Sequence, residues 1–183
     1  MTAPTASLTG TYTLDPTHTR LGFVARHAMV TKVRGSFDEF EATAVLDGEN
    51  PANSTAKVTF QIASVQTGQK QRDEHLRTND FFDAETYPTG EFVSTAVKVT
   101  GDDTFEMTGD LTLKGITKPV TITWESTGTA QDPWGNTRVG FEGRATINRK
   151  DWGIEYNAAL ETGGVLIGEK VQLEFDVSAI KTA

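Results

Sequence analysis

The chain has 183 residues, a net charge of −8, no cysteine, and only 37% hydrophobic residues. This length fits one domain, and the missing cysteine excludes disulfides, thiol nucleophiles and thiolate metal sites. The negative charge opposes binding to nucleic-acid phosphates and to strongly anionic membranes.

The residue types favour β-strands. Threonine occurs 29 times, and Val, Ile and Thr together supply 50 residues, whereas leucine occurs only 10 times. Branched side chains suit a pleated sheet, so an all-helical fold is excluded. Residues 1–8 lack the basic and apolar regions of a secretory signal. We expect a flexible N-terminus over residues 1–8, a single domain over residues 9–183, and a cytoplasmic location.

Apolar and polar residues alternate with a period of two along most of the chain, which predicts eight or nine strands. In chain order these are residues 11–14, 19–28, 33–47, 57–62, 91–99, 104–113, 120–125, 138–147 and 171–177. In the third, the alternation shifts phase at Asp38–Glu39, and we expect a β-bulge in one long strand. In the fifth, the pattern is ambiguous because Phe92 alternates out of phase with Val97 and Val99.

One helix is predicted at residues ~69–79, between the fourth and fifth strands. Leu76 is its one large apolar residue, so it is not a core helix, and Phe81–Phe82 follow it directly. We interpret the segment as a lid over one end of a barrel. Because one face of each strand is polar, the fold class is all-β, an extended eight-stranded antiparallel β-barrel that closes on itself.

Few residues offer catalytic or metal-binding chemistry. The three histidines, His18, His27 and His75, are not spaced as metal ligands, and no cofactor is expected. His27 either donates a hydrogen bond into the barrel or is satisfied by a backbone carbonyl, the latter being favoured. Arg72–Asp73 lacks a third catalytic partner and is more typical of a structural ion pair.

The aromatic residues fall mostly on the inward faces of the predicted strands. The interior of an eight-stranded barrel is just wide enough to be filled by side chains or to hold one slender ligand. Composition leaves both alternatives open.

The order of motifs resembles that of the YceI-like family. The resemblance rests on LDPTHT with FVARH and VRGSF (residues 14–37), RDEHL, DFFD and YP (residues 72–88), GDLTLKG (109–115) and INRKDWGI (147–154). It implies a lipocalin-like barrel whose apolar tunnel binds polyisoprenoid chains, isoprenoid quinones or other long amphiphiles. It also implies a homodimer, and it supplies no catalytic residues. Many family members carry a secretory signal, which residues 1–8 do not show.

We therefore expect a non-enzymatic protein that binds, transports or stores a long-chain amphiphile, such as a polyisoprenoid, an isoprenoid quinone or a fatty-acid derivative. We also expect transient membrane contact and no nucleic-acid partner. The alternatives are an enzyme acting on a lipid-like substrate and general stress-related sequestering of hydrophobic molecules. The predicted ligand-binding residues, with the polar head placed near the helix, are Leu21, Phe23, His27, Phe37, Phe40, Phe60, Ile62, Arg72, Asp73, His75, Leu76, Phe81, Phe82, Phe92, Met107, Leu111, Leu113, Trp124, Phe141, Ile147, Trp152 and Phe175.

Overall fold

The computed structural model describes residues 6–28, 30–158 and 166–183. Over these ranges the chain forms one sheet and one short α-helix, α1 (Lys70–Leu76). The strands are β1 (Gly10–Leu14), β2 (Arg20–His27), β3 (Thr31–Phe37), β4 (Phe40–Leu46), β5 (Thr55–Gln61), β6 (Val65–Gln66), β7 (Thr89–Val99), β8 (Thr104–Leu113), β9 (Ile116–Gln131), β10 (Thr137–Asn148) and β11 (Lys170–Lys181).

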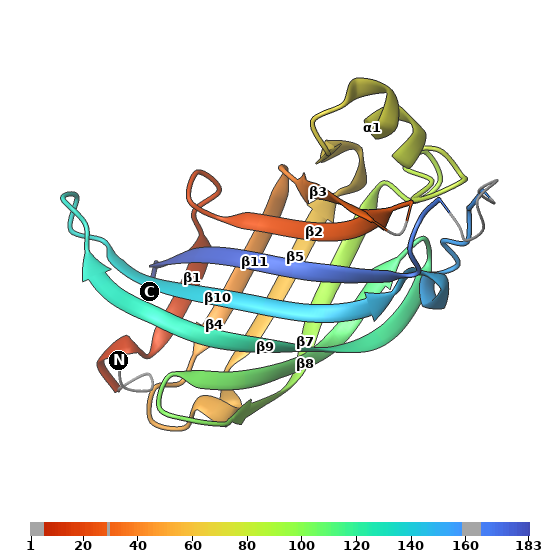
Figure 1. Ribbon diagram of the computed structural model, residues 1–183. Helices are drawn as coiled ribbons and strands as arrows, with labels where there is room; N and C mark the ends of the chain where they lie inside the picture. The colour runs from red at the N-terminus through yellow and green to blue at the C-terminus, as the bar shows by residue number, and fades with distance from the viewer. Residues whose placement is uncertain (1–5, 29, 159–165) are drawn as a thin grey trace.

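Eight strands close into the predicted antiparallel barrel, which is confirmed. The order is β1-β4-β5-β7-β8-β9-β10-β11, and β1 pairs back onto β11 to close it (Figure 1). Strand β11 carries two partners on one edge. Its last residues pair with β1, and its middle residues pair with β2, from which β3 and β6 extend the sheet beyond the barrel.

The phase shift at Asp38–Glu39 marks a corner between two strands, so the prediction of one long bulged strand is wrong. β3 pairs with β2 and β6, whereas β4 pairs with β1 and β5. The Asp38 carboxylate accepts a hydrogen bond from the Ser36 hydroxyl at 2.8 Å, which fixes the turn. A corner keeps the apolar residues on both sides of Asp38–Glu39 facing inward, as a bulge would. The two structures therefore give the same sequence pattern.

A bulge in β7 explains the ambiguous pattern of residues 91–99. Thr95 is the extra residue, because Ser94 pairs with Gly109 and Ala96 with Thr108. The insertion reverses the alternation, so Phe92, Val97 and Val99 all line the barrel interior.

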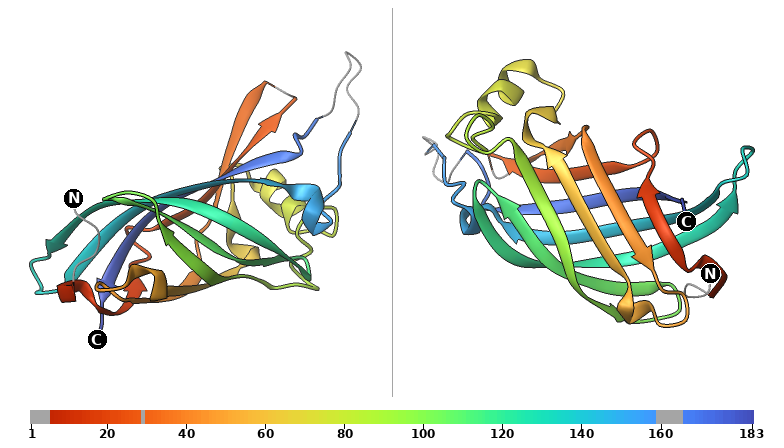
Figure 2. Two further views of the ribbon diagram at one scale, coloured as in Figure 1. Left: turned by 90° about the horizontal axis from the view of Figure 1, so that it is seen from below. Right: turned by 180° about the vertical axis from the view of Figure 1, so that it is seen from behind.

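The helix covers one end of the barrel, and the two chain termini lie at the other end (Figures 1 and 2). It is shorter than the predicted residues ~69–79, because hydrogen-bonded turns replace it from Arg77 onward. Behind it, Ile62, Phe81 and Trp152 are buried with inward residues of the strands in the main core cluster. The Trp152 indole N–H donates to the Leu111 carbonyl at 2.8 Å, which ties this packing to β8. This end of the barrel is therefore filled by side chains.

Residues 1–5 of the N-terminal segment predicted to be flexible lie outside the described residues, and Ala6–Leu8 form a 3-10 turn. The single-domain assignment remains a prediction. Among the described residues, no helix has the length and apolar character needed to cross a membrane.

Candidate ligand-binding cavity

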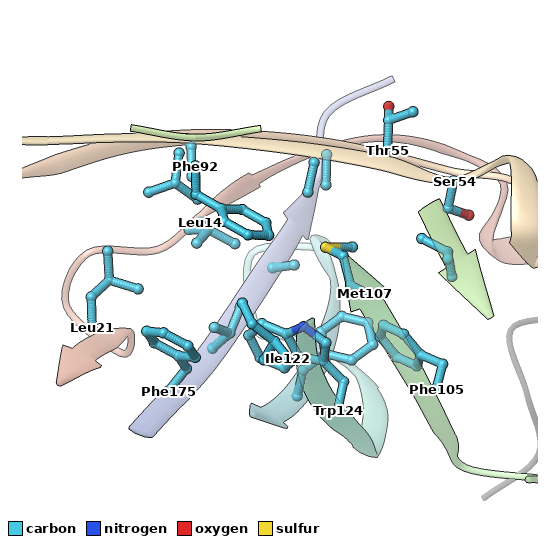
Figure 3. Close-up of a pocket in the computed structure, with 18 of the residues that line it drawn as sticks. Leu14, Leu21, Ser54, Thr55, Phe92, Phe105, Met107, Ile122, Trp124 and Phe175 are labelled. Carbon is cyan, nitrogen blue, oxygen red and sulfur yellow. The ribbon is translucent and has the colours of Figure 1, made fainter. Parts of the chain in front are cut away.

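The barrel encloses a cavity of about 220 Å³ whose lining side chains are almost all apolar (Figure 3). One buried water needs only about 15 Å³ on this measure, so the space suits a much larger molecule. Its walls come from all eight barrel strands and from β2 and β3. The apolar residues on alternate positions of each strand create this lining, because successive side chains point to opposite faces.

The cavity reaches the surface at the end opposite α1. There it is bounded by the β7–β8 turn, residues 101–104, and by Ser54 and Thr55 ahead of β5. Gly101, Asp102 and Thr55 are solvent-exposed as well as cavity-lining, so we call this end the mouth. The closed end is marked by Leu113, beyond which the packed core begins.

Four aromatic side chains cluster just inside the mouth. The Trp124 ring stacks against Phe105 of the neighbouring strand β8, with ring centroids 6.4 Å apart, and against Phe175 of β11, with ring centroids 5.7 Å apart. Phe141 meets both Phe105 and Trp124 edge-on. These contacts stabilise the arrangement of the four rings, since stacked and edge-on pairs are both favourable aromatic geometries.

Glycines on neighbouring strands make room for the large rings. Gly143 pairs with Trp124, and a Cβ at Gly143 would lie 2.5 Å from the indole. Gly90 pairs with Phe60 in the same way, with a clash at 2.2 Å. An inward-facing strand glycine is therefore a sequence signal for an aromatic residue lying across it.

The charged groups with strongly shifted pKa values lie outside the cavity. Arg138 donates to Asp15 at 2.7 Å and to Asp132 at 2.8 Å, which fastens the β9–β10 hairpin beside β1. The Arg138 guanidinium and the hydroxyl of Thr17 hold the pKa of Asp15 well below its usual range. For Asp132, burial raises the pKa, but hydrogen bonds from the Asn136 N–H and Arg138 outweigh it and lower the pKa to about 2.

Twelve of the predicted ligand-binding residues line the cavity, and their contact with a ligand remains a prediction. They are Leu21, Phe23, Phe37, Phe60, Phe92, Met107, Leu111, Leu113, Trp124, Phe141, Ile147 and Phe175. Six others do not line it and instead belong to, or pack against, the core at the closed end: Phe40, Ile62, Leu76, Phe81, Phe82 and Trp152. His27 ends β2 and is exposed to solvent, so it does not point inward as expected.

The predicted head-group residues of α1 are also outside the cavity. Asp73 accepts hydrogen bonds from the Thr67 N–H and hydroxyl at 2.8 and 2.6 Å, and Arg72 donates to Thr67 as well. His75 Nε2 lies 2.8 Å from Asp80 Oδ2, and the His75 ring packs edge-on against Phe81. These residues fasten the helix and its flanking loops to one another. Arg72 and Asp73 do so through Thr67, which each of them contacts, and not through the ion pair expected between them.

Several lining residues were absent from the predicted set. They include Tyr12, Leu14, Ala42, Ala44, Val58, Val97, Val99, Phe105, Val120, Ile122, Val139, Leu173 and Val177. Most of them lie on the same inward face as a predicted residue of the same strand, so the period-two alternation is the signal that identifies them. Val97 and Val99 were hidden by the bulge at Thr95.

No group of three or more His, Asp or Glu side chains that could hold a metal ion occurs in the part of the chain that the structure describes. Within the same ranges, the charged side chains that line the cavity are those of Asp102 and Asp103, both at the mouth.

Together these features define a closed antiparallel β-barrel with an apolar cavity reached from one end. The comparisons identify the family: the YceI-like domain model matches residues 12–179, and the chain belongs to the YceI-like family. A UPF0312 protein of Photorhabdus laumondii is 40% identical over 152 residues, covering 82% of this chain and 79% of that protein. A UPF0312 protein of Pseudomonas aeruginosa is 43% identical over 138 residues, covering 75% and 72%.

Solved structures share the fold. Burkholderia cenocepacia BcnA superposes with a TM-score of 0.79 at 26% identity, over 90% of this chain and 98% of that one. The Campylobacter jejuni YceI protein gives 0.75 at 28% identity, over 86% and 90%. A polyisoprenoid-binding domain from Saccharophagus degradans gives 0.69 at 18% identity, over 93% and 98%, a likeness that shows the fold alone.

Proposed function

We propose that this chain binds a long-chain amphiphile in the barrel cavity and carries or stores it: a polyisoprenoid, an isoprenoid quinone or a fatty-acid derivative. The observation that carries the proposal is the continuous apolar lining from the mouth to Leu113. The solved Saccharophagus domain with this fold is described as polyisoprenoid-binding, which agrees with such a ligand. We also propose that the chain works as a binding protein, as a homodimer, with transient membrane contact during loading.

The size and chemistry of the cavity support a chain-like ligand. From Thr104 to Leu113, β8 spans nine residue steps. At about 3.3 Å per step and a strand tilt of about 40°, the cavity is roughly 23 Å deep. Burying ten methylene groups there would contribute about 8 kcal/mol before the cost of ordering the chain. That margin is sufficient for useful affinity without any charged contact.

The test is lipid uptake by the protein purified without detergent. The chain is incubated with phosphatidylcholine vesicles that carry a mixture of polyprenols, isoprenoid quinones and fatty acids, then re-isolated and studied by native mass spectrometry with lipid extraction. We expect one long-chain amphiphile per barrel. Protein that remains empty after this exposure would refute the proposal.

A pair of variants shows whether uptake occurs inside the barrel. The Met107 side chain extends into the cavity (Figure 3), so Met107→Trp fills part of it and should reduce uptake strongly. Glu106 is the adjacent residue on the opposite face of β8, so Glu106→Trp adds the same ring outside and should leave uptake unchanged. Equal uptake by both variants would place the ligand elsewhere on the surface.

A further inference from the structure

The turn between β9 and β10 carries an exposed tryptophan. Trp134 is 79% exposed to solvent, whereas Trp152 is 2% exposed and Trp124 lies in the cavity wall. Tryptophan has a large apolar surface, and in folded proteins it is largely covered on average. A ring that is exposed on a turn does not stabilise the core of this chain, and it is available to contact another surface.

The β9–β10 hairpin projects from the mouth end of the barrel. Glu125 of β9 pairs with Thr104, the first residue of β8 at the mouth, and β9 continues for six residues beyond Glu125, to Gln131. At about 3.3 Å per residue, the hairpin extends about 20 Å past the start of β8. Figures 1 and 2 show it projecting at the end of the barrel opposite α1. The turn therefore presents Trp134 beyond the mouth.

Asp132 stabilises the conformation of this turn. Its carboxylate accepts hydrogen bonds from the backbone N–H groups of Trp134 and Asn136, each at 2.9 Å, and from the Arg138 guanidinium at 2.8 Å. Arg138 also donates to Asp15, directly after β1, at 2.7 Å, which fastens the hairpin to the barrel. Because the turn is already ordered, contact through Trp134 costs little conformational entropy.

The chemistry of the turn suits the interface of a lipid bilayer. Between Thr127 and Thr137 the one ionisable residue is Asp132, whose side chain is 7% exposed and paired with Arg138. The turn therefore brings no unpaired charge that would have to leave water. Tryptophan is enriched at membrane–water interfaces, because its ring is apolar and its N–H is polar.

The charge of the chain favours one kind of lipid surface. The net charge of −8, together with Asp102 and Asp103 at the mouth, opposes approach to an anionic membrane. Phosphatidylcholine is zwitterionic, and its ammonium group attracts carboxylates. A quaternary ammonium also makes a favourable cation–π contact with an indole ring such as that of Trp134.

From these observations we propose that the β9–β10 turn docks the protein on zwitterionic lipid surfaces, by inserting the Trp134 ring into the interface at the mouth end of the barrel. The inference rests on the proposed function, in which the cavity is loaded at a membrane, and it specifies the surface that makes the contact. Trp134 does not line the cavity, so this role is separate from holding the ligand.

The experiment measures co-sedimentation of the wild type, Trp134→Ala and Val30→Ala with vesicles. The vesicles contain phosphatidylcholine alone or an equal mixture of phosphatidylcholine and phosphatidylglycerol. Val30→Ala is the matched control, because Val30 is 74% exposed and lies in the β2–β3 turn, at the α1 end of the barrel (Figure 1). Quenching of tryptophan fluorescence by phosphatidylcholine with brominated acyl chains is a second measurement, which reports insertion of the ring.

The wild type should bind phosphatidylcholine vesicles, and Trp134→Ala should bind them about tenfold more weakly or worse, because an indole buries a large apolar surface. Val30→Ala should bind as the wild type does. Phosphatidylglycerol should weaken binding of the wild type, and added salt should restore it by screening the repulsion. The brominated lipid should quench the fluorescence of the wild type.

Four results would overturn the inference: no binding of the wild type to vesicles, equal binding by the wild type and Trp134→Ala, equal losses in Trp134→Ala and Val30→Ala, and tighter binding to phosphatidylglycerol. A wild-type dimer that becomes a monomer in Trp134→Ala, in sedimentation velocity, would also overturn it, because a second copy would then cover the ring. All of these leave the proposed function intact if the wild-type barrel is loaded with lipid after incubation. A barrel that stays empty would refute the proposed function itself.

Discussion

Introducing a large side chain at the closed end of the cavity should shorten the tail that the barrel accepts. Ala42 is the first residue of β4 that lines the cavity, and it forms a paired row with Val58 of β5. Phe40, two residues earlier on the same face of β4, packs against the core at the closed end and does not line the cavity, so a ring at Ala42 would close the last 5 Å or so of depth. Ala42→Phe therefore removes the space for the end of a fully inserted tail.

The magnitude follows from the groups that are excluded. An isoprene unit contributes five carbon atoms, each worth about 0.8 kcal/mol when buried, so displacing one unit costs up to about 4 kcal/mol before ordering costs are subtracted. A ligand with a shorter tail, which never reaches this row, should bind Ala42→Phe as it binds the wild type. We therefore expect Ala42→Phe to bind ligands with short tails with unchanged affinity and to gain less affinity than the wild type as the tail becomes longer.

The assay uses ubiquinones whose tails grow by one isoprene unit at a time. Affinity for the wild type should rise with each unit and then level off, and for Ala42→Phe it should level off about one unit earlier. Glu41→Phe, on the outer face of the same strand, is the control. Thermal melting should show both variants within about 4 °C of the wild type, equivalent to roughly 1 kcal/mol for a chain of this size. An unchanged plateau would refute the proposed depth of the cavity, and an equal loss for short tails would indicate general disruption.

Two further predictions concern stability. The buried Arg149 donates hydrogen bonds to the carbonyls of Gly168, Ile154 and Ile167. Arg149→Met should therefore lower the free energy of unfolding, measured in urea, by about 2–4 kcal/mol, because these acceptors lose their partner. The control Arg144→Met, at an exposed position, should change that free energy by less than about 0.5 kcal/mol, and similar losses in the two variants would contradict the role assigned to Arg149. The lowered pKa of Asp132 means that its ionised form stabilises the folded chain above the ordinary value of 3.8 and that this contribution is lost as pH falls toward about 2. The midpoint of thermal unfolding should accordingly fall less steeply between about pH 4 and pH 2 in Asp132→Asn than in the wild type, and parallel curves would refute the coupling.

The barrel was predictable because apolar and polar residues alternate within each strand, and this pattern alone indicates which face of the strand is buried. One wet face and one apolar face explain both the abundance of threonine and the low hydrophobic content, and eight such strands close without exposed edges. The corner at Asp38–Glu39 was not predictable, because a corner and a bulge shift the phase equally. Which of them forms depends on partners distant in sequence: β2 and β6 on one side, β1 and β5 on the other.

The sequence predicted most of the inward-facing residues of the candidate site, but it did not predict which end of the barrel is open. Alternation identified which faces point inward, and the rings of Phe105, Trp124 and Phe141 lie on such faces. It contains no information on which end of the barrel is filled. The polar residues of α1 suggested a mouth there, but Asp73 and Arg72 bond to Thr67, and the large side chains around them close that end. The open end is instead formed by turns of small polar residues, whose position follows from the strand register.

The closure of the barrel joins strands that are far apart in the chain. Tyr12 of β1 pairs with Lys181 of β11, and the Thr11 and Thr182 backbones are hydrogen-bonded there as well. During synthesis, β1 leaves the ribosome long before its partner exists, and the cavity wall stays open until the final strand is added. Contacts at such sequence separation form slowly, because the intervening chain must be ordered first. We therefore expect the interior to be enclosed only after β11 has joined the sheet, so that a half-made chain has no closed compartment for the proposed ligand.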